Sequence, residues 1–169
     1  ATIIVTTLGL TDTLATNSTT TVTNGTTGVI FNSQSSNVSE IIIPSTIAET
    51  TNITLDLSAL VNGSYQVTIP NNLSLNRFGS IYNYSADIAA GTVITGISNW
   101  TGEIIMPTVT SGASISGGTV DVVISLGADE ELNFSDAVKI TLGGMAGKKA
   151  AWTRGAVLTK ITTVCNNAT

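Results

Sequence analysis

Short apolar runs that alternate with polar residues follow one another along most of the chain. In residues 52–57, for example, Ile53, Leu55 and Leu57 alternate with polar side chains, and this period of two is typical of a half-buried strand. Glycine, asparagine, serine and proline separate the runs, as they do between antiparallel strands. The pattern predicts strands over residues 29–31, 38–43, 52–57, 64–69, 79–85, 92–97, 103–106, 119–126, 132–134, 138–142 and 156–164.

Signals for turns and helices complete this prediction. Asn62-Gly63 is typical of a two-residue hairpin turn, because both residues tolerate a positive φ. Residues 111–118 are predicted to be a flexible loop, and only residues 146–154 could form a short helical turn. Many short strands and almost no helix in one domain-sized chain predict an all-β fold, an immunoglobulin-like or Greek-key β-sandwich.

The first eleven residues form a β-rich stretch that carries no charge and no proline. Such a stretch promotes aggregation unless another part of a protein covers it. One interpretation is the first strand of the chain's own sheet. The other is an extended N-terminal donor strand, which completes the sheet of a neighbouring identical subunit. On the second interpretation, residues 1–13 are the donor strand, 14–27 a polar linker and 28–169 the sandwich domain.

The two faces of this N-terminal segment differ in their side chains. One face carries three large aliphatic residues, which suit a hydrophobic groove better than the face that ends at Gly9. The predicted inserting face is Ile4, Thr6, Leu8 and Leu10. The predicted interface residues of the whole strand are Ile3, Ile4, Val5, Thr6, Leu8 and Leu10.

Acceptor motifs for N-linked glycans, Asn-x-Ser/Thr, are unusually dense. Ten of the fourteen asparagines lie in such a motif, whereas the serine and threonine content would give roughly four by chance. Attached sugars require exposed sites in an exported protein, so the motifs predict covalent N-glycans around much of the domain. The predicted acceptors are Asn17, Asn24, Asn37, Asn52, Asn62, Asn72, Asn83, Asn99, Asn133 and Asn167.

Charge is scarce in this chain of 169 residues. Only 10% of the residues are charged, whereas 46 are serine or threonine, so solubility must depend on hydroxyls, amides and attached sugars. A surface of this kind keeps its properties when carboxylates are protonated, which suggests tolerance of acid. All eleven acidic residues lie between Asp12 and Asp136, and five of the six basic residues follow Ala137. The chain is acidic overall, so no nucleic-acid partner is expected.

Catalytic and metal-binding signatures are weak or missing. The chain has no histidine, which removes the commonest general base and metal ligand. Residues 129–131 (Asp-Glu-Glu) lack the ligand spacing of a calcium loop, and residues 143–148 lack the phosphate-loop motif. The single Cys165 has no partner for a disulfide within the chain. We therefore expect no enzyme, no cofactor and no metal site.

The apolar runs are too short to form a transmembrane helix, so no membrane span is expected. The chain begins at Ala1 without an initiator methionine, which indicates a mature product from which a signal peptide has been removed. We therefore expect an extracellular location.

The apolar N-terminal segment, the predicted sandwich and the density of glycan acceptors together resemble the archaeal thread filament pilins of Sulfolobus-type acidophiles. Archaeal bundling pilins are the second family that this organisation resembles. The resemblance implies a heavily glycosylated subunit of a cell-surface filament, polymerised head to tail by donor-strand complementation and serving adhesion or biofilm formation.

Two other functions fit the same predicted fold. One is a monomeric cell-surface module that binds glycans, for which Trp100, Tyr82 and Tyr84 are the candidate aromatic platform. The other is a surface-layer or capsid protein with a jelly-roll fold.

Overall fold

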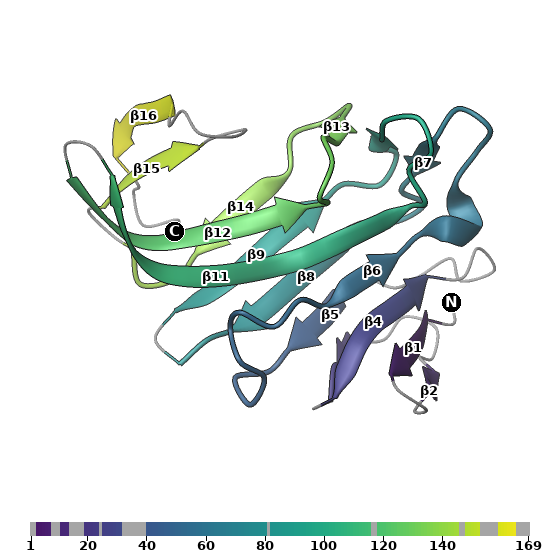
Figure 1. The fold of residues 1–169 in the computed structure, drawn as a ribbon, viewed down its shortest axis with the longest axis horizontal. Helices are drawn as coiled ribbons and strands as arrows, with labels where there is room; N and C mark the ends of the chain where they lie inside the picture. Colours follow the sequence, from purple (N-terminus) through teal and green to yellow (C-terminus); the bar gives the residue numbers. More distant parts are fainter. Residues whose placement is uncertain are drawn as a thin grey trace.

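The computed structural model describes residues 3–7, 11–13, 19–23, 25–31, 40–80, 82–115, 118–145, 148–152 and 159–164. Nearly all of its regular structure is β, which confirms the predicted all-β sandwich (Figure 1). The only helical element in these residues is a 3-10 turn, η1 (Ser58–Leu60).

The larger sheet has six strands in the order β12-β11-β6-β4-β1-β2. Figure 1 shows the long β11–β12 pair lying over strands of a second sheet. The six strands are β12 (Gly118–Gly127), β11 (Glu103–Ile115), β6 (Thr54–Asp56), β4 (Thr26–Phe31), β1 (Ile3–Thr7) and β2 (Thr11–Thr13).

The second sheet has five strands in the order β14-β9-β8-β5-β3. Two small sheets flank the sandwich: a three-stranded one, β13-β10-β7, and the β15–β16 pair. The five strands are β14 (Lys139–Leu142), β9 (Asn83–Ile88), β8 (Leu73–Phe78), β5 (Glu40–Ile43) and β3 (Thr19–Thr21). The others are β13 (Asn133–Phe134), β10 (Val93–Thr95), β7 (Gln66–Thr68), β15 (Lys149–Trp152) and β16 (Thr159–Val164).

The core lies between the two large sheets and follows from the alternation in the sequence. In β8, Leu73 and Leu75 are buried while Ser74 and Asn76 are partly exposed, and β9 shows the same alternation. Buried aliphatic side chains from β4, β6 and β11 meet them from the other sheet, and Val29, Leu55 and Ile104 are fully buried. This apolar layer holds the sandwich together.

Several predicted elements differ in the structure. The hairpin at Asn62-Gly63 is wrong, because β6 pairs with β11 and β4, whereas β7 pairs with β10. The predicted loop over 111–118 is wrong for residues 111–115 and 118, since β11 continues to Ile115 and pairs with β12 from Gly118 on; residues 116–117 lie outside the described residues. Strand β8 was not predicted. Chain reversal between Gly79 and Tyr82 divides the predicted strand 79–85, and the amide of Gly79 donates to the Tyr82 carbonyl oxygen.

The segment expected as a polar linker, residues 14–27, also differs in the part that the structure describes. It contains β3, which pairs in parallel with β5, and the first residues of β4. Val22 is buried, and its amide donates to the carbonyl oxygen of Ile42 at 2.7 Å. Residues 19–23 and 25–27 therefore belong to the sandwich. Similarly, residues 149–152 form strand β15, whereas the sequence allowed a short helical turn over residues 146–154.

Candidate functional site

The first strand lies near one edge of the larger sheet and pairs within its own chain. β1 is antiparallel to β4, with Ile4 opposite Ile30 and Val5 opposite Val29. On its other side it pairs with β2, which forms the outer edge. Of the two interpretations of the N-terminal segment, the structure thus describes the one in which the strand lies on its own sheet.

The register of β1 indicates which of its positions belong to the core side. Val29 is fully buried, and opposed positions in an antiparallel ladder share one face of the sheet. Val5 therefore takes the register position on the core side, together with the other odd-numbered positions. This differs from the prediction that the even-numbered face inserts. Of the predicted interface residues, Leu8 and Leu10 lie outside the described residues.

The two edge strands of the larger sheet, β12 and β2, each carry a charged residue, whereas the inner strand β4 carries none. Free edge strands invite pairing with other chains, and charged side chains on them oppose it. At the far edge, Asp121 of β12 forms an exposed ion pair with Lys148, with 2.8 Å between the carboxylate and ammonium. At the other end of the sheet the edge strand is β2, which contains Asp12. Further in, β4 carries no charged residue and is covered by β1. Without β1 the edge of β4 would be free and uncharged, so this edge is the candidate site for subunit pairing.

The candidate glycan acceptors that the structure describes all lie on the surface. Six of the ten predicted acceptors fall in described residues, and each of the six is exposed. By contrast, Asn71 and Asn76, which are not in acceptor motifs, are partly buried. The exposed acceptors are Asn52, Asn62, Asn72, Asn83, Asn99 and Asn133, whereas Asn17, Asn24, Asn37 and Asn167 lie outside the described residues.

Two of these acceptors are also held by hydrogen bonds. The Oδ1 of Asn62 accepts from the amides of Ser64 and Gln66, at 2.9 and 3.0 Å. The Oδ1 of Asn72 accepts from the amide of Ala90 at 2.9 Å. A glycan is attached through the amide nitrogen, so both contacts to Oδ1 are compatible with an attached sugar.

Two of the three residues of the candidate aromatic platform are buried, and only Tyr82 is partly exposed. Trp100 is only 5% exposed and its indole NH donates to the carbonyl oxygen of Glu103 at 3.1 Å, while Tyr84 is 3% exposed. Gly96 lies directly against the Trp100 ring, where an added Cβ would approach to 2.3 Å. Trp100 and Tyr84 are therefore core residues and cannot stack on an external sugar.

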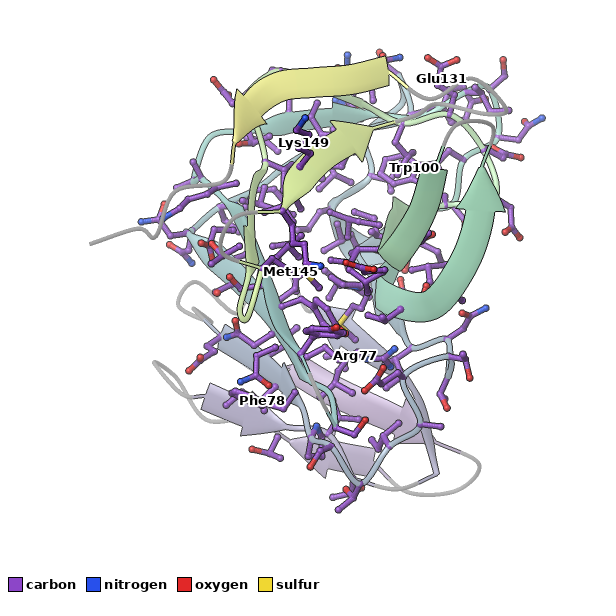
Figure 2. The ribbon with its side chains drawn as sticks, turned by 90° about the vertical axis from the view of Figure 1, so that its left-hand side faces the viewer. Arg77, Phe78, Trp100, Glu131, Met145 and Lys149 are labelled. Atoms are coloured by element: carbon purple, nitrogen blue, oxygen red, sulfur yellow. The ribbon has the colours of Figure 1, made fainter. Side chains whose placement is uncertain are left out.

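Arg77 was not among the predicted site residues, yet it is only 1% exposed and lies inside the sandwich (Figure 2). Its guanidinium donates to the backbone carbonyl of Glu49 and, at 2.7 Å, to that of Thr51. Burial lowers the pKa of Arg77, and the nearby Glu49 and Tyr84 oppose this shift. The sequence signal for the burial of Arg77 was its spacing, because it follows Leu75 by two residues and so continues the inward face of β8.

Tyr84 lies opposite Arg77 in the β8–β9 ladder, and its hydroxyl is buried with no hydrogen-bond partner among the described residues. Burial is the main cause that raises the pKa of Tyr84 to about 12, and the charge of Glu49 adds to it. An unfolded tyrosine ionises near pH 10, so between pH 10 and 12 the folded state holds a proton that the unfolded state has lost. Stability therefore falls as the pH rises through this range.

We expect replacement of Tyr84 by phenylalanine to leave the free energy of unfolding unchanged or raise it by up to about 1 kcal/mol at pH 7, because the hydroxyl has no hydrogen-bond partner in the described part of the chain. Between pH 10 and 12 the wild type should lose about 2–3 kcal/mol that the variant retains. Urea denaturation across this pH range measures both effects. Parallel pH profiles for the two proteins would contradict the assignment to Tyr84.

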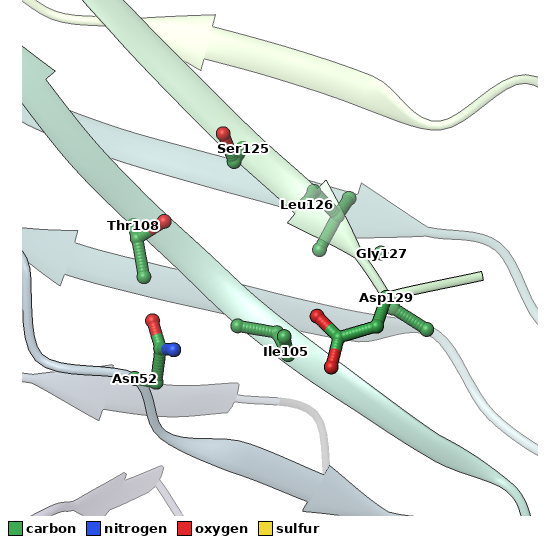
Figure 3. Close-up of a pocket in the computed structure, with 8 residues that line it drawn as sticks. Asn52, Ile105, Thr108, Ser125, Leu126, Gly127 and Asp129 are labelled. Atoms are coloured by element: carbon green, nitrogen blue, oxygen red, sulfur yellow. The ribbon is translucent and has the colours of Figure 1, made fainter. Parts of the chain in front are cut away.

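The hollow in Figure 3 lies where the β11–β12 ladder shifts register between Ile105 and Thr108. Its volume is about 260 Å³, and Asn52, Thr108, Ser125 and Asp129 give it a polar lining. Asn52, an exposed glycan acceptor, thus faces an open polar surface on the outside of the sheet.

The acidic segment 129–131, the glycine-rich segment 143–148 and Cys165 were the other candidate sites in the sequence. No group of three or more acidic, cysteine or histidine side chains in the described residues could hold a metal ion. Gly143 and Gly144 follow β14, where the amide of Gly143 donates to the Asn83 carbonyl oxygen at 2.8 Å and Gly144 has a φ of 78°. Cys165 lies outside the described range.

Within the residues that the structure describes, no helix has the length and apolar character needed to span a membrane. Comparison of this chain with protein-family models, with curated proteins and with solved structures finds no match.

Proposed function

We propose that this chain is the structural subunit of an extracellular surface filament, polymerised by donation of its first strand to the next identical subunit. The observation that carries the proposal is the position of β1 on the sheet. It pairs along the edge of β4, with Val5 opposite the buried Val29. In this chain the strand at that position is Ile-Ile-Val-Thr-Thr, which is uncharged and rich in β-branched residues. The filament would serve adhesion or biofilm formation.

Exchange between copies needs no new interface. Identical chains can swap an identical element, and the register of β1 against β4 is then the same as within one chain. The β1–β2 pair is followed by residues 14–18, after which β3 joins the opposite sheet. A fully extended segment of five residues spans about 17 Å, enough to carry the first strands toward a neighbour.

The exposed acceptors support a filament coated with covalent N-glycans, which requires export from the cell. The six described acceptors come from turns and strand ends of several sheets, so a coat on them would cover much of the domain. The core fits the proposed tolerance of acid, because Arg77 is the only buried ionisable residue apart from Tyr84 among those described. No carboxylate whose burial the structure describes is buried, so in that part of the chain acid has no buried carboxylate to protonate.

Negative-stain electron microscopy of the glycosylated protein and of a variant lacking residues 1–13 tests this function. We expect fibres from the full chain and none from the shortened one. Compact single particles from both proteins would contradict a filament. Sheets or closed shells would favour the surface-layer or capsid alternative.

A further inference from the structure

Large hydrophobic side chains that remain exposed lie close to glycan acceptors. Four such side chains in the described residues are more than a third exposed: Tyr65, Phe78, Ile97 and Ile140. The amide of Tyr65 donates to the carbonyl oxygen of Asn62 at 3.1 Å, and Ile97 precedes Asn99 by two residues. Phe78 lies opposite Asn83 in the β8–β9 ladder. Three of the four therefore neighbour an asparagine of an acceptor motif.

Phe78 and Asn83 lie together on the outer face of the five-stranded sheet. Phe78 is 41% exposed, and Figure 2 shows it at the outside of the sheet while Arg77, its neighbour in β8, lies in the interior. Opposed positions in a ladder place their Cβ atoms about 5 Å apart, so the ring of Phe78 is within reach of a group attached to Asn83.

The surface beside this pair is hollowed. A shallow hollow of about 210 Å³ is lined by Phe78 and Asn83 together with Asn76, Ser85, Thr141 and Gly143. Gly143 borders the hollow directly beside Asn83, since a Cβ at this position would lie 3.3 Å from the carbonyl oxygen of Asn83 and 3.7 Å from its Cβ. The hollow thus combines an aromatic ring with amide and hydroxyl groups next to a glycan acceptor.

We propose that the first sugar of a glycan on Asn83 packs against the ring of Phe78. The inference rests on the glycosylation in the proposed function and adds a defined contact for it. One face of a pyranose ring presents C–H groups, which cover apolar surface and are attracted by the negative face of an aromatic ring. The hydroxyls of the sugar lie near Asn76, Ser85 and Thr141. A contact that is present only in the folded state stabilises that state, so this glycan stabilises the β8–β9 hairpin.

The attached sugar is the occupant that the geometry favours over a second protein. It is tethered across the ladder from the ring, so its effective concentration there is high. Phe78 is a single exposed ring, whereas contacts between proteins require a larger continuous surface. Tyr65 and Ile97 are likewise exposed and lie within three residues of the acceptors Asn62 and Asn99.

A double-mutant cycle in glycosylated protein tests the contact. Ser85→Ala removes the acceptor motif but keeps Asn83, and Phe78→Ser removes the ring. We expect Ser85→Ala to lower the melting temperature by about 2–4 °C when Phe78 is present and by about 1 °C or less in the Phe78→Ser background. Phe78→Leu, which keeps apolar bulk, serves if Phe78→Ser fails to fold.

Two controls complete the cycle. The same variants made in a host without N-glycosylation should show no coupling between positions 78 and 85. Ile140→Ser is the matched surface control, because Ile140 is 43% exposed and pairs with Ala86, which is not an acceptor. Its effect should add to that of Ser85→Ala.

Mass spectrometry of the peptide that contains Asn83 separates the possible failures. An unmodified Asn83 would overturn both the contact and the proposed glycosylation at this site. A modified Asn83 without coupling to Phe78 would overturn the contact and leave the glycosylation standing. Coupling that persists in unglycosylated protein would also overturn it and indicate a contact between protein groups.

Discussion

Removal of residues 1–13 is expected to lower the free energy of unfolding by on the order of 5 kcal/mol and to abolish polymerisation. The loss combines the main-chain hydrogen bonds of the β1–β4 ladder with exposure of the surface around Val29. The free energy of unfolding of a natural domain is about 5–15 kcal/mol, so the shortened protein should still fold but with a small free energy of unfolding. Urea denaturation of the shortened and full chains measures the difference.

A free peptide of residues 1–13 should restore this stability when it is added to the shortened protein. The register places Val5 at a core-side position and Ile4 at the opposite one. A peptide with Val5→Asp should therefore fail to stabilise the protein, whereas one with Ile4→Asp should retain much of the effect. Equal failure of both altered peptides, or rescue by a scrambled one, would contradict this register.

Replacement of Arg77 by methionine is expected to destabilise the fold by about 3–5 kcal/mol. The guanidinium holds the carbonyl oxygens of Glu49 and Thr51, and methionine would leave both without this donor. The amide of Val109 also donates to the Glu49 carbonyl, at 3.1 Å, so the segment that Arg77 holds also meets β11. Loss of Arg77 should therefore loosen the contact between the two large sheets. Chemical denaturation measures the change.

Arg77→Lys and Lys139→Met are the matched variants for this experiment. Lysine keeps the positive charge but lacks the planar fork, so its cost should be intermediate. Lys139 is exposed on β14, and its replacement by methionine should change stability by no more than about 0.5 kcal/mol. An Arg77→Met variant as stable as the Lys139→Met variant would show that the buried guanidinium contributes nothing.

The sequence predicted the fold class because alternation with a period of two directly reflects burial on one face of a strand. Residues 52–57 illustrate this, since Ile53, Leu55 and Leu57 are all fully buried. The alternation in β8 was missed because its inward positions end with Arg77, a charged residue that is rarely buried without partners. Its partners are backbone carbonyls from residues 49–51, and no local pattern reveals such a contact.

Pairing between strands was harder to predict than the strands themselves. Asn62-Gly63 carries the signal of a hairpin, yet the Oδ1 of Asn62 instead organises a local turn with Ser64 and Gln66. The serine- and glycine-rich residues 111–118 were predicted to form a loop, but pairing along β11 and β12 extends through them. At Asn62 a side-chain contact within a local turn replaces the hairpin, and in residues 111–115 antiparallel pairing with β12 replaces the predicted loop.

The candidate site was predicted unevenly for the same reason. Surface exposure of the acceptor asparagines follows from their polar turns and strand ends, and the six described acceptors are exposed. The inward face of the first strand depends on its register against β4, which the composition of the strand alone does not determine. The burial of Trp100 depends on Gly96, which lies directly against the indole ring.

Cysteine cross-linking of β1 to β4 tests the donated strand most directly. Ile4→Cys and Ile30→Cys place the thiols at opposed positions, whose Cα separation is within the range of a disulfide, and Cys165→Ser removes the native thiol. After oxidation of assembled protein, a donated strand links neighbouring subunits and gives a ladder of covalent multimers on a denaturing, non-reducing gel. Oxidised monomers alone would show that each first strand stays on its own sheet, and would contradict the proposed filament.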